Sequence, residues 1–259
     1  MSAAGPSARD LVALPRAAVL MLWASAYLRG DLGPDDAAEM SYGVGRSGPG
    51  DGGQNLFAWM TGLRRLPLAQ LRLVLPVPGR IAGLVGPPAA LPAALESEQA
   101  IVVTGAGIAD HTLIPSVTDP GGMVHAVTWE RFDAPVGSQV PPAATSGHAR
   151  EELLRAMRRV AEGSIDLDLV PDEPAESARI PPTWTSTALP RHVDDSAAHL
   201  LVLAARTLIL TRSEIDEGSG HTVHLSEALA RRGLLDELHD VARGALVEAV
   251  ERIVAAEMG

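Results

Sequence analysis

The sequence predicts an α+β protein in which N-terminal helices and a small sheet precede a C-terminal helical bundle. Apolar residues recur at helical spacing near the start of the chain, alternate with a period near two over its middle part, and return to helical spacing from residue 149 onward. Because the strands and the later helices occupy separate stretches, α+β is favoured over a doubly wound sheet. We expect a mixed α/β region over residues 1–132, a Pro/Gly linker over 133–148 and a helical region over 149–259, and the two regions can share one core.

Three helices are expected before the sheet. The first covers Ala17–Leu28, which is apolar on nearly every face and is therefore expected to be buried, with Pro15 suited to its first turn and Gly30 to its end. The second begins near Pro34, where two aspartates suit the positive end of a helix dipole. The third follows Asn55, a preferred N-cap residue, and its apolar residues keep helical spacing to about residue 66.

The middle part of the chain predicts strands joined by turns that are rich in proline and glycine. Leucines and valines alternate with other residues after residue 70, and β-branched or aromatic residues are enriched in the later runs. The expected strands cover residues 71–77, 81–85, 101–104 and 123–132, and a short helix is expected over 89–97.

The remainder of the chain predicts helices with one interruption. Residues 164–190 contain five prolines and several acids, so an irregular connection is expected there. Helices are expected over residues 149–162, 194–212, 221–232 and 235–253, and Gly233 is expected to separate the last two.

Composition excludes several kinds of chemistry. All 21 basic residues are arginine and there is no cysteine, so thiolate nucleophiles, disulfides, Cys-based metal sites and catalytic or phosphate-binding lysines are absent. The formal net charge is −11, which repels phosphate backbones and anionic membranes, so neither is expected as a partner. The longest apolar run is shorter than the roughly 20 residues that span a bilayer. We expect a cytoplasmic protein, with which the lack of cysteine is consistent.

A glycine-rich loop over Gly43–Gly53 is the first candidate binding site. Its backbone N–H groups and the N-terminus of the helix that follows favour an anion, such as the phosphate of a small molecule. The loop matches Gly-x-Gly-x-x-Gly, but no strand precedes it, so the context of a dinucleotide site is missing. The simpler alternative is a solvated connector. The residues predicted to bind a ligand are Gly43, Gly45, Arg46, Asn55, Arg64 and Arg65.

A second Gly-x-Gly motif follows an apolar run at residues 101–110. A strand that runs into Gly-x-Gly is how a dinucleotide-binding turn begins, in which Gly105 allows the tight turn and Gly107 the close approach of the backbone. The same stretch resembles the Gly-Ala-Gly-Ile opening of sirtuins. However, Asp110 stands where the third glycine is required, and the zinc-binding cysteines of sirtuins are missing. A structural turn between two strands is therefore favoured.

Histidines, serines and paired carboxylates give no complete catalytic or metal-binding set. His221 and His224 have a His-x-x-His spacing, and His192 and His199 flank two aspartates, but no third ligand is marked. No Gly-x-Ser-x-Gly motif is present, and the paired acids are explained by helix N-termini. We therefore assign no catalytic residue, metal or cofactor.

One stretch resembles a known family. Residues 71–79 (Leu-Arg-Leu-Val-Leu-Pro-Val-Pro-Gly), Gly86-Pro-Pro88 and residues 93–103 are similar to segments of an actinobacterial family with no assigned function. The resemblance implies a cytoplasmic bacterial protein and transfers no activity.

The leading functional hypothesis is a non-catalytic binding or regulatory protein that acts through contacts with another protein or as a homodimer. It rests on the many amphipathic helices and on the lack of a catalytic set. The alternative is an enzyme or sensor that binds a phosphorylated small molecule at Gly43–Gly53. Convergence of Arg46, Asn55 and Arg64 on one pocket favours the alternative, whereas an apolar patch on the last helix favours protein contact.

Overall fold

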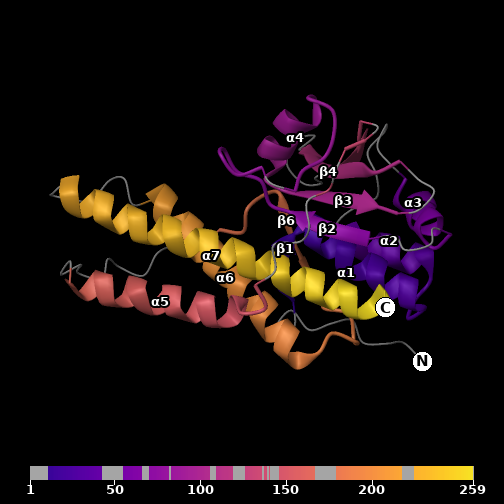
Figure 1. Ribbon diagram of the computed structural model, residues 1–259. Helices are drawn as coiled ribbons and strands as arrows, with labels where there is room; N and C mark the ends of the chain where they lie inside the picture. The colour runs from indigo at the N-terminus through magenta and orange to yellow at the C-terminus, as the bar shows by residue number, and fades with distance from the viewer. Residues whose placement is uncertain are drawn as a thin grey trace. The chain divides into compact units, whose positions relative to one another are not determined.

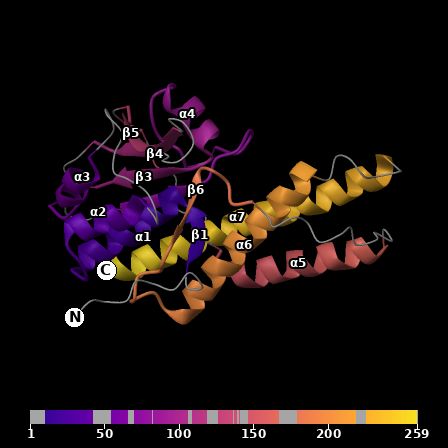
Figure 2. The same ribbon diagram turned by 180° about the vertical axis from the view of Figure 1, so that it is seen from behind.

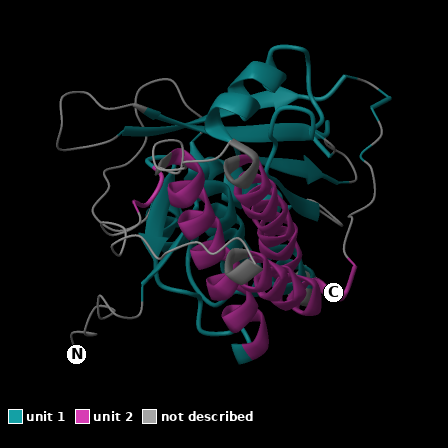
Figure 3. Cartoon of the chain, turned by 90° about the vertical axis from the view of Figure 1, so that its left-hand side faces the viewer, with its two compact units in different colours: residues 1–143, 182–195, 250–259 teal, residues 144–181, 196–249 magenta. Residues whose placement is uncertain are grey.

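The computed structural model divides the chain into two compact units. It describes residues 11–42, 55–65, 70–81, 83–105, 109–118, 126–135, 137–138, 140, 146–166, 179–217 and 225–258. Unit 1 comprises residues 1–143, 182–195 and 250–259, and unit 2 comprises residues 144–181 and 196–249 (Figure 3). All eight Trp, Tyr and Phe residues lie in unit 1, so intrinsic fluorescence reports on that unit alone.

The described residues of unit 1 form a four-stranded antiparallel sheet, a two-stranded ribbon, four complete helices and the last turns of a helix that begins in unit 2. The sheet has the strand order β2-β3-β4-β5, and the ribbon pairs β1 with β6. The strands are β1 (Val12–Pro15), β2 (Gln70–Val74), β3 (Ala100–Thr104), β4 (His111–Thr118), β5 (Ala126–Asp133) and β6 (Trp184–Thr187). The helices are α1 (Arg16–Arg29), α2 (Pro34–Tyr42), α3 (Leu56–Leu63) and α4 (Ala90–Ser97).

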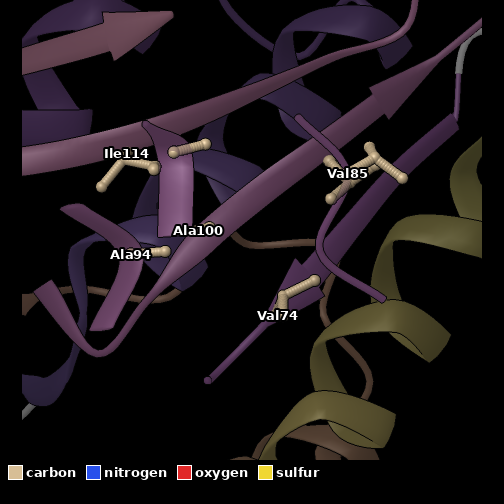
Figure 4. Packing of buried hydrophobic residues seen from close by; sticks show 7 residues of the cluster. Val74, Val85, Ala94, Ala100 and Ile114 are labelled. Carbon is tan, nitrogen blue, oxygen red and sulfur yellow. The ribbon is translucent and has the colours of Figure 1, made fainter. Parts of the chain in front are cut away.

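The four-stranded sheet lies between two helical layers. Helix α1 contacts β2, β3 and β4 on one face, and α4 covers the other, as Figure 1 shows. Helix α2 packs along α1, and α3 packs against both (Figure 2). Small and β-branched side chains fill the space beneath α4, including Val74, Val85, Ala94, Ala100 and Ile114 (Figure 4). Alanines on the helix allow its backbone to approach the sheet closely.

Helix α1 forms the centre of unit 1, since every residue from Arg16 to Tyr27 is buried. Its N-terminus has no side-chain cap of its own. Instead, Oε1 of Gln99, at the start of β3, accepts a hydrogen bond of 2.8 Å from the Ala17 N–H. Nε2 of Gln99 donates to the Thr183 carbonyl at 2.9 Å. One buried side chain, 1% exposed, therefore satisfies a helix terminus and a segment that is 84 residues distant in the chain.

Unit 2 contains the helices α5 (Ala149–Asp166), α6 (Asp195–Glu217) and most of α7 (Leu225–Met258), whose last turns belong to unit 1. Figures 1 and 2 show α5 beside α7. The Glu248 carboxylate of α7 accepts hydrogen bonds from the backbone N–H groups of Ser146 (2.9 Å) and Gly147 (3.1 Å), which fixes the segment before α5. Helices α6 and α7 meet where Thr211 Oγ1 lies 2.8 Å from His239 Nδ1.

The α+β class is confirmed, and three local expectations are wrong. Residues 81 and 83–85 form no strand, because the chain turns there and Gly83 has a φ of 94°. The connection over residues 164–190 contains strand β6, which pairs with β1 rather than with the main sheet. Gly233 does not end a helix, since α7 continues through it. Strands β1 and β4 had no counterpart among the expected elements.

Candidate functional site

The residues predicted to bind an anion do not all fall in the described chain. Gly43, Gly45 and Arg46 lie outside the described residues, as does the rest of the Gly43–Gly53 loop. The other three belong to α3 and its ends. Asn55 precedes its first turn, and Arg64 and Arg65 follow its last.

Asn55 and Arg64 lie at opposite ends of the same helix. Asn55 Oδ1 accepts a hydrogen bond of 3.0 Å from the Ala58 N–H, so the predicted N-cap is confirmed and this oxygen is occupied by its own helix. Helix α3 has eight residues, which at about 1.5 Å per residue separates its ends by roughly 12 Å. The two side chains therefore do not meet at one helix N-terminus.

Arg64 packs against an aromatic side chain of unit 1. Its guanidinium lies over the Tyr27 ring, 5.3 Å from the ring centroid. Tyr27 is in the last turn of α1, and Arg64 follows the last turn of α3. Cations are favoured at helix C-termini because the last carbonyl groups carry partial negative charge. The position of Arg64 is therefore explained by packing and helix electrostatics without a ligand.

The second Gly-x-Gly motif connects two antiparallel strands. Gly105 follows β3, which pairs with β4 in the register Ile101↔Leu113 and Val103↔His111. Residues 106–108, which include Gly107, lie outside the described residues. The next described element after Gly105 is strand β4, so no described helix N-terminus follows the motif to bind a pyrophosphate. The motif lies between two antiparallel strands, as expected.

His111 is buried, at 2% exposed, and both of its ring nitrogens are engaged. Its Nε2 accepts from Trp59 Nε1 at 3.3 Å, and its Nδ1 lies 3.1 Å from the Ala109 carbonyl. This pattern requires the neutral ring with the proton on Nδ1. Burial lowers the pKa of His111, and Arg131 acts in the same direction, although the Ala109 hydrogen bond raises it. His111 therefore joins α3 to the sheet and has no nitrogen left for substrate or metal.

Two other histidines also make structural contacts. His192 Nδ1 lies 2.9 Å from Asp31 Oδ2, and Arg29 Nε lies 3.4 Å from the same oxygen. The Nε2 atom of His192 is buried, so this His–Asp pair does not present a base to solvent. His239 contacts α6 through Thr211. In the described parts of the chain no three His, Asp or Glu side chains are grouped to hold a metal ion, and His221 and His224 lie outside those parts.

The helices of unit 2 expose large aliphatic side chains. Leu210 of α6 is 57% exposed and Leu229 of α7 is 63% exposed. Further aliphatic residues on these helices are only half-buried: Leu154, Met157, Val160, Val202, Leu203, Ile209, Ile215, Leu234 and Leu235. By contrast, α1 of unit 1 buries every aliphatic residue up to Tyr27. The expected binding residues did not include Leu210 and Leu229, although the seven-residue spacing of Leu203 and Leu210 was a usable indication.

The fold and the side-chain geometry together define an α+β protein. Its described interior histidines make structural contacts, and the helices of its second unit expose aliphatic side chains. None of the described helices is long and apolar enough to cross a membrane. A family described as Rv1486c-like protein, N-terminal domain, matches residues 17–146, which is half of the chain. The chain belongs to this family. No curated protein and no solved structure matches it.

Proposed function

We propose that the protein is a non-catalytic binding protein that acts through protein–protein contacts made by the helices of unit 2. The observation that carries this proposal is the exposure of Leu210 and Leu229, which are each more than half accessible. The other leucines of α6 and α7 whose side chains are described are buried or half-buried. Burial of a leucine side chain stabilises a complex by about 1.5–3 kcal/mol, so two such residues can anchor a partner.

The ring nitrogens of the interior histidines are used or buried within the fold, which favours this proposal over catalysis. General acid–base chemistry needs a titrating nitrogen within reach of substrate. His111 uses both of its nitrogens within unit 1, and the Nε2 atom of His192 is buried. The alternative ligand, a phosphorylated small molecule at Gly43–Gly53, stays a prediction, and the separation of Asn55 from Arg64 does not favour it.

The setting that we propose is the cytoplasm of an actinobacterium. The complete use of arginine in place of lysine suits a GC-rich genome, and the absence of cysteine suits any compartment, including a reducing one. The alternative is a homodimer, in which a second copy of this chain is the partner at the same surface.

Affinity purification of variants from the native host tests the proposal. Leu210→Asn and Leu229→Asn are combined in one variant, which removes the two leucines that are most exposed among the described side chains of unit 2. Met40→Asn and Ile81→Asn form the matched control, because these residues of unit 1 are each 44% exposed. Quantitative mass spectrometry then compares the proteins retained by each variant with those retained by the wild-type chain.

We expect the unit 2 variant to lose its partner at least tenfold while the unit 1 control retains it, because only the first removes apolar anchors from the proposed surface. Far-ultraviolet circular dichroism checks that both variants remain folded. Equal retention by the two variants, or turnover of a substrate by the purified protein, contradicts the proposal.

A further inference from the structure

One line along α6 combines two leucines, a histidine and an arginine. Residues 199, 203, 206 and 210 follow the i, i+4, i+7, i+11 spacing of a single helix face. We call this set the α6 stripe: His199, Leu203, Arg206 and Leu210. His199, Arg206 and Leu210 are exposed, and Leu203 is half-buried. The buried residues of α6 occupy other positions around the helix, and their centre lies opposite the stripe: Ala197, Leu200, Leu201, Ala204, Ala205, Thr207, Leu208 and Thr211. Leu200 and Thr207 form the buried edge next to the stripe.

The charge of the α6 stripe is opposite in sign to that of the chain. The chain has a net charge of −11, yet residues 196–213 contain no acid and include two arginines. Arg212 pairs with Asp216 at 3.3 Å. The Arg206 side chain makes no ion pair or hydrogen bond with any described residue, and it lies between Leu203 and Leu210 on the stripe. An exposed arginine between two leucines is suited to a carboxylate that arrives with apolar neighbours.

We propose that the α6 stripe is the docking site for an amphipathic helix of a partner protein, with acidic residues beside its apolar face. This inference rests on the proposed function and names the surface and the chemistry of the partner. The partner's apolar side chains pack against Leu203 and Leu210, and one of its carboxylates pairs with Arg206. The charge argues against a second copy of this chain, because a two-fold axis that sets Leu203 of one copy against Leu210 of the other passes beside Arg206 and brings the two Arg206 side chains together.

Site-specific photo-crosslinking in the host cell tests the inference on the full chain. The probe is p-benzoylphenylalanine, placed in separate variants at Leu210, at Leu229 and at Ile81, which is exposed in unit 1. Each adduct is purified and the captured segment is sequenced by mass spectrometry. We expect an adduct from position 210 and none from position 81. The captured segment should carry Asp or Glu beside apolar residues at helical spacing.

Charge variants at Arg206 test the predicted ion pair. In the position-210 background, Arg206→Glu should lower the yield of adduct about fivefold, because it removes one attraction and adds a repulsion. Arg206→Lys should retain most of the yield. Arg150→Glu is the matched control, since Arg150 is an exposed arginine of α5 in the same unit, and it should leave the yield unchanged.

Each other result contradicts the inference in a distinguishable way. An adduct at position 229 but none at position 210 contradicts docking at the α6 stripe, but it agrees with the proposed function. An adduct of this chain with itself, a captured segment that is basic, or a yield that Arg206→Glu leaves unchanged overturns the partner's chemistry. Failure of both positions, together with unchanged retention in the affinity experiment, overturns the stripe and the proposed function alike.

Discussion

Replacement of Gln99 by an apolar residue of similar length is expected to lower the free energy of unfolding of unit 1. Gln99→Met keeps the length of the side chain but removes its acceptor and its donor. The buried Ala17 N–H and the part-buried Thr183 carbonyl, which lie 2.8 and 2.9 Å from the Gln99 amide in the wild-type protein, then lose their partners. A buried polar group without a partner costs about 1–3 kcal/mol. Because the Thr183 carbonyl is only part-buried and water can replace part of its lost bond, the two groups together predict a loss of about 2–4 kcal/mol.

Urea unfolding followed by tryptophan fluorescence measures this loss, because all four tryptophans lie in unit 1. With a urea m value of about 2 kcal/mol/M, the midpoint should fall by about 1–2 M. Gln70→Met is the matched control, since Gln70 is an exposed glutamine of β2, and it should change stability by less than about 0.5 kcal/mol. If Gln99→Met is no more destabilising than Gln70→Met, Gln99 does not have the role in capping α1 that we assign to it.

Two further predictions concern the helices and the sheet. Gly233→Ala should stabilise the chain by about 0.5–1 kcal/mol in thermal unfolding followed at 222 nm, because Gly233 is inside α7 with nothing within 4 Å of an added Cβ. Gly163→Ala should gain less stability, since its Cβ would lie 2.6 Å from a leucine side chain. A loss of stability in Gly233→Ala would instead indicate that a helix ends at Gly233. Burial lowers the pKa of His111, so the unfolded chain binds more protons and the stability of unit 1 should fall as the pH drops below about 6.5. His111→Gln should flatten this fall in urea titrations at pH 7.5 and 5, whereas His148→Gln, at an exposed position, should not.

Local signals in the sequence predicted most helices of unit 1. Gly30 ends α1 in the left-handed conformation with a φ of 89°, and Asn55 caps α3, because each residue acts on its own neighbours in the chain. The four-residue strands of the ribbon gave no such signal. Val12–Pro15 and Trp184–Thr187 pair across more than 160 residues, and neither is long enough to show a period.

The candidate site was also hard to predict from the sequence, because it depends on contacts between distant residues. The Gly-x-Gly motif that begins at Gly105 resembled a ligand-binding turn because glycine is common in any sharp turn, but this motif lies between two antiparallel strands. The exposed position of Leu210 depends on which side of α6 packs, and that depends on contacts such as Thr211 with His239 of a distant helix. Gly233 was expected to end a helix because propensity disfavours glycine, but a cost of about 1 kcal/mol is small beside the packing of α7.

The size of the protein in a fresh extract of its host tests the central claim most directly. Gel filtration compares the tagged wild-type chain with the Leu210→Asn, Leu229→Asn variant at equal, native-level expression. We expect the wild-type chain to elute in a larger complex and the variant to elute as the free chain. Identical elution of the two chains, whether large or small, would contradict the claim that these leucines of unit 2 hold a protein partner.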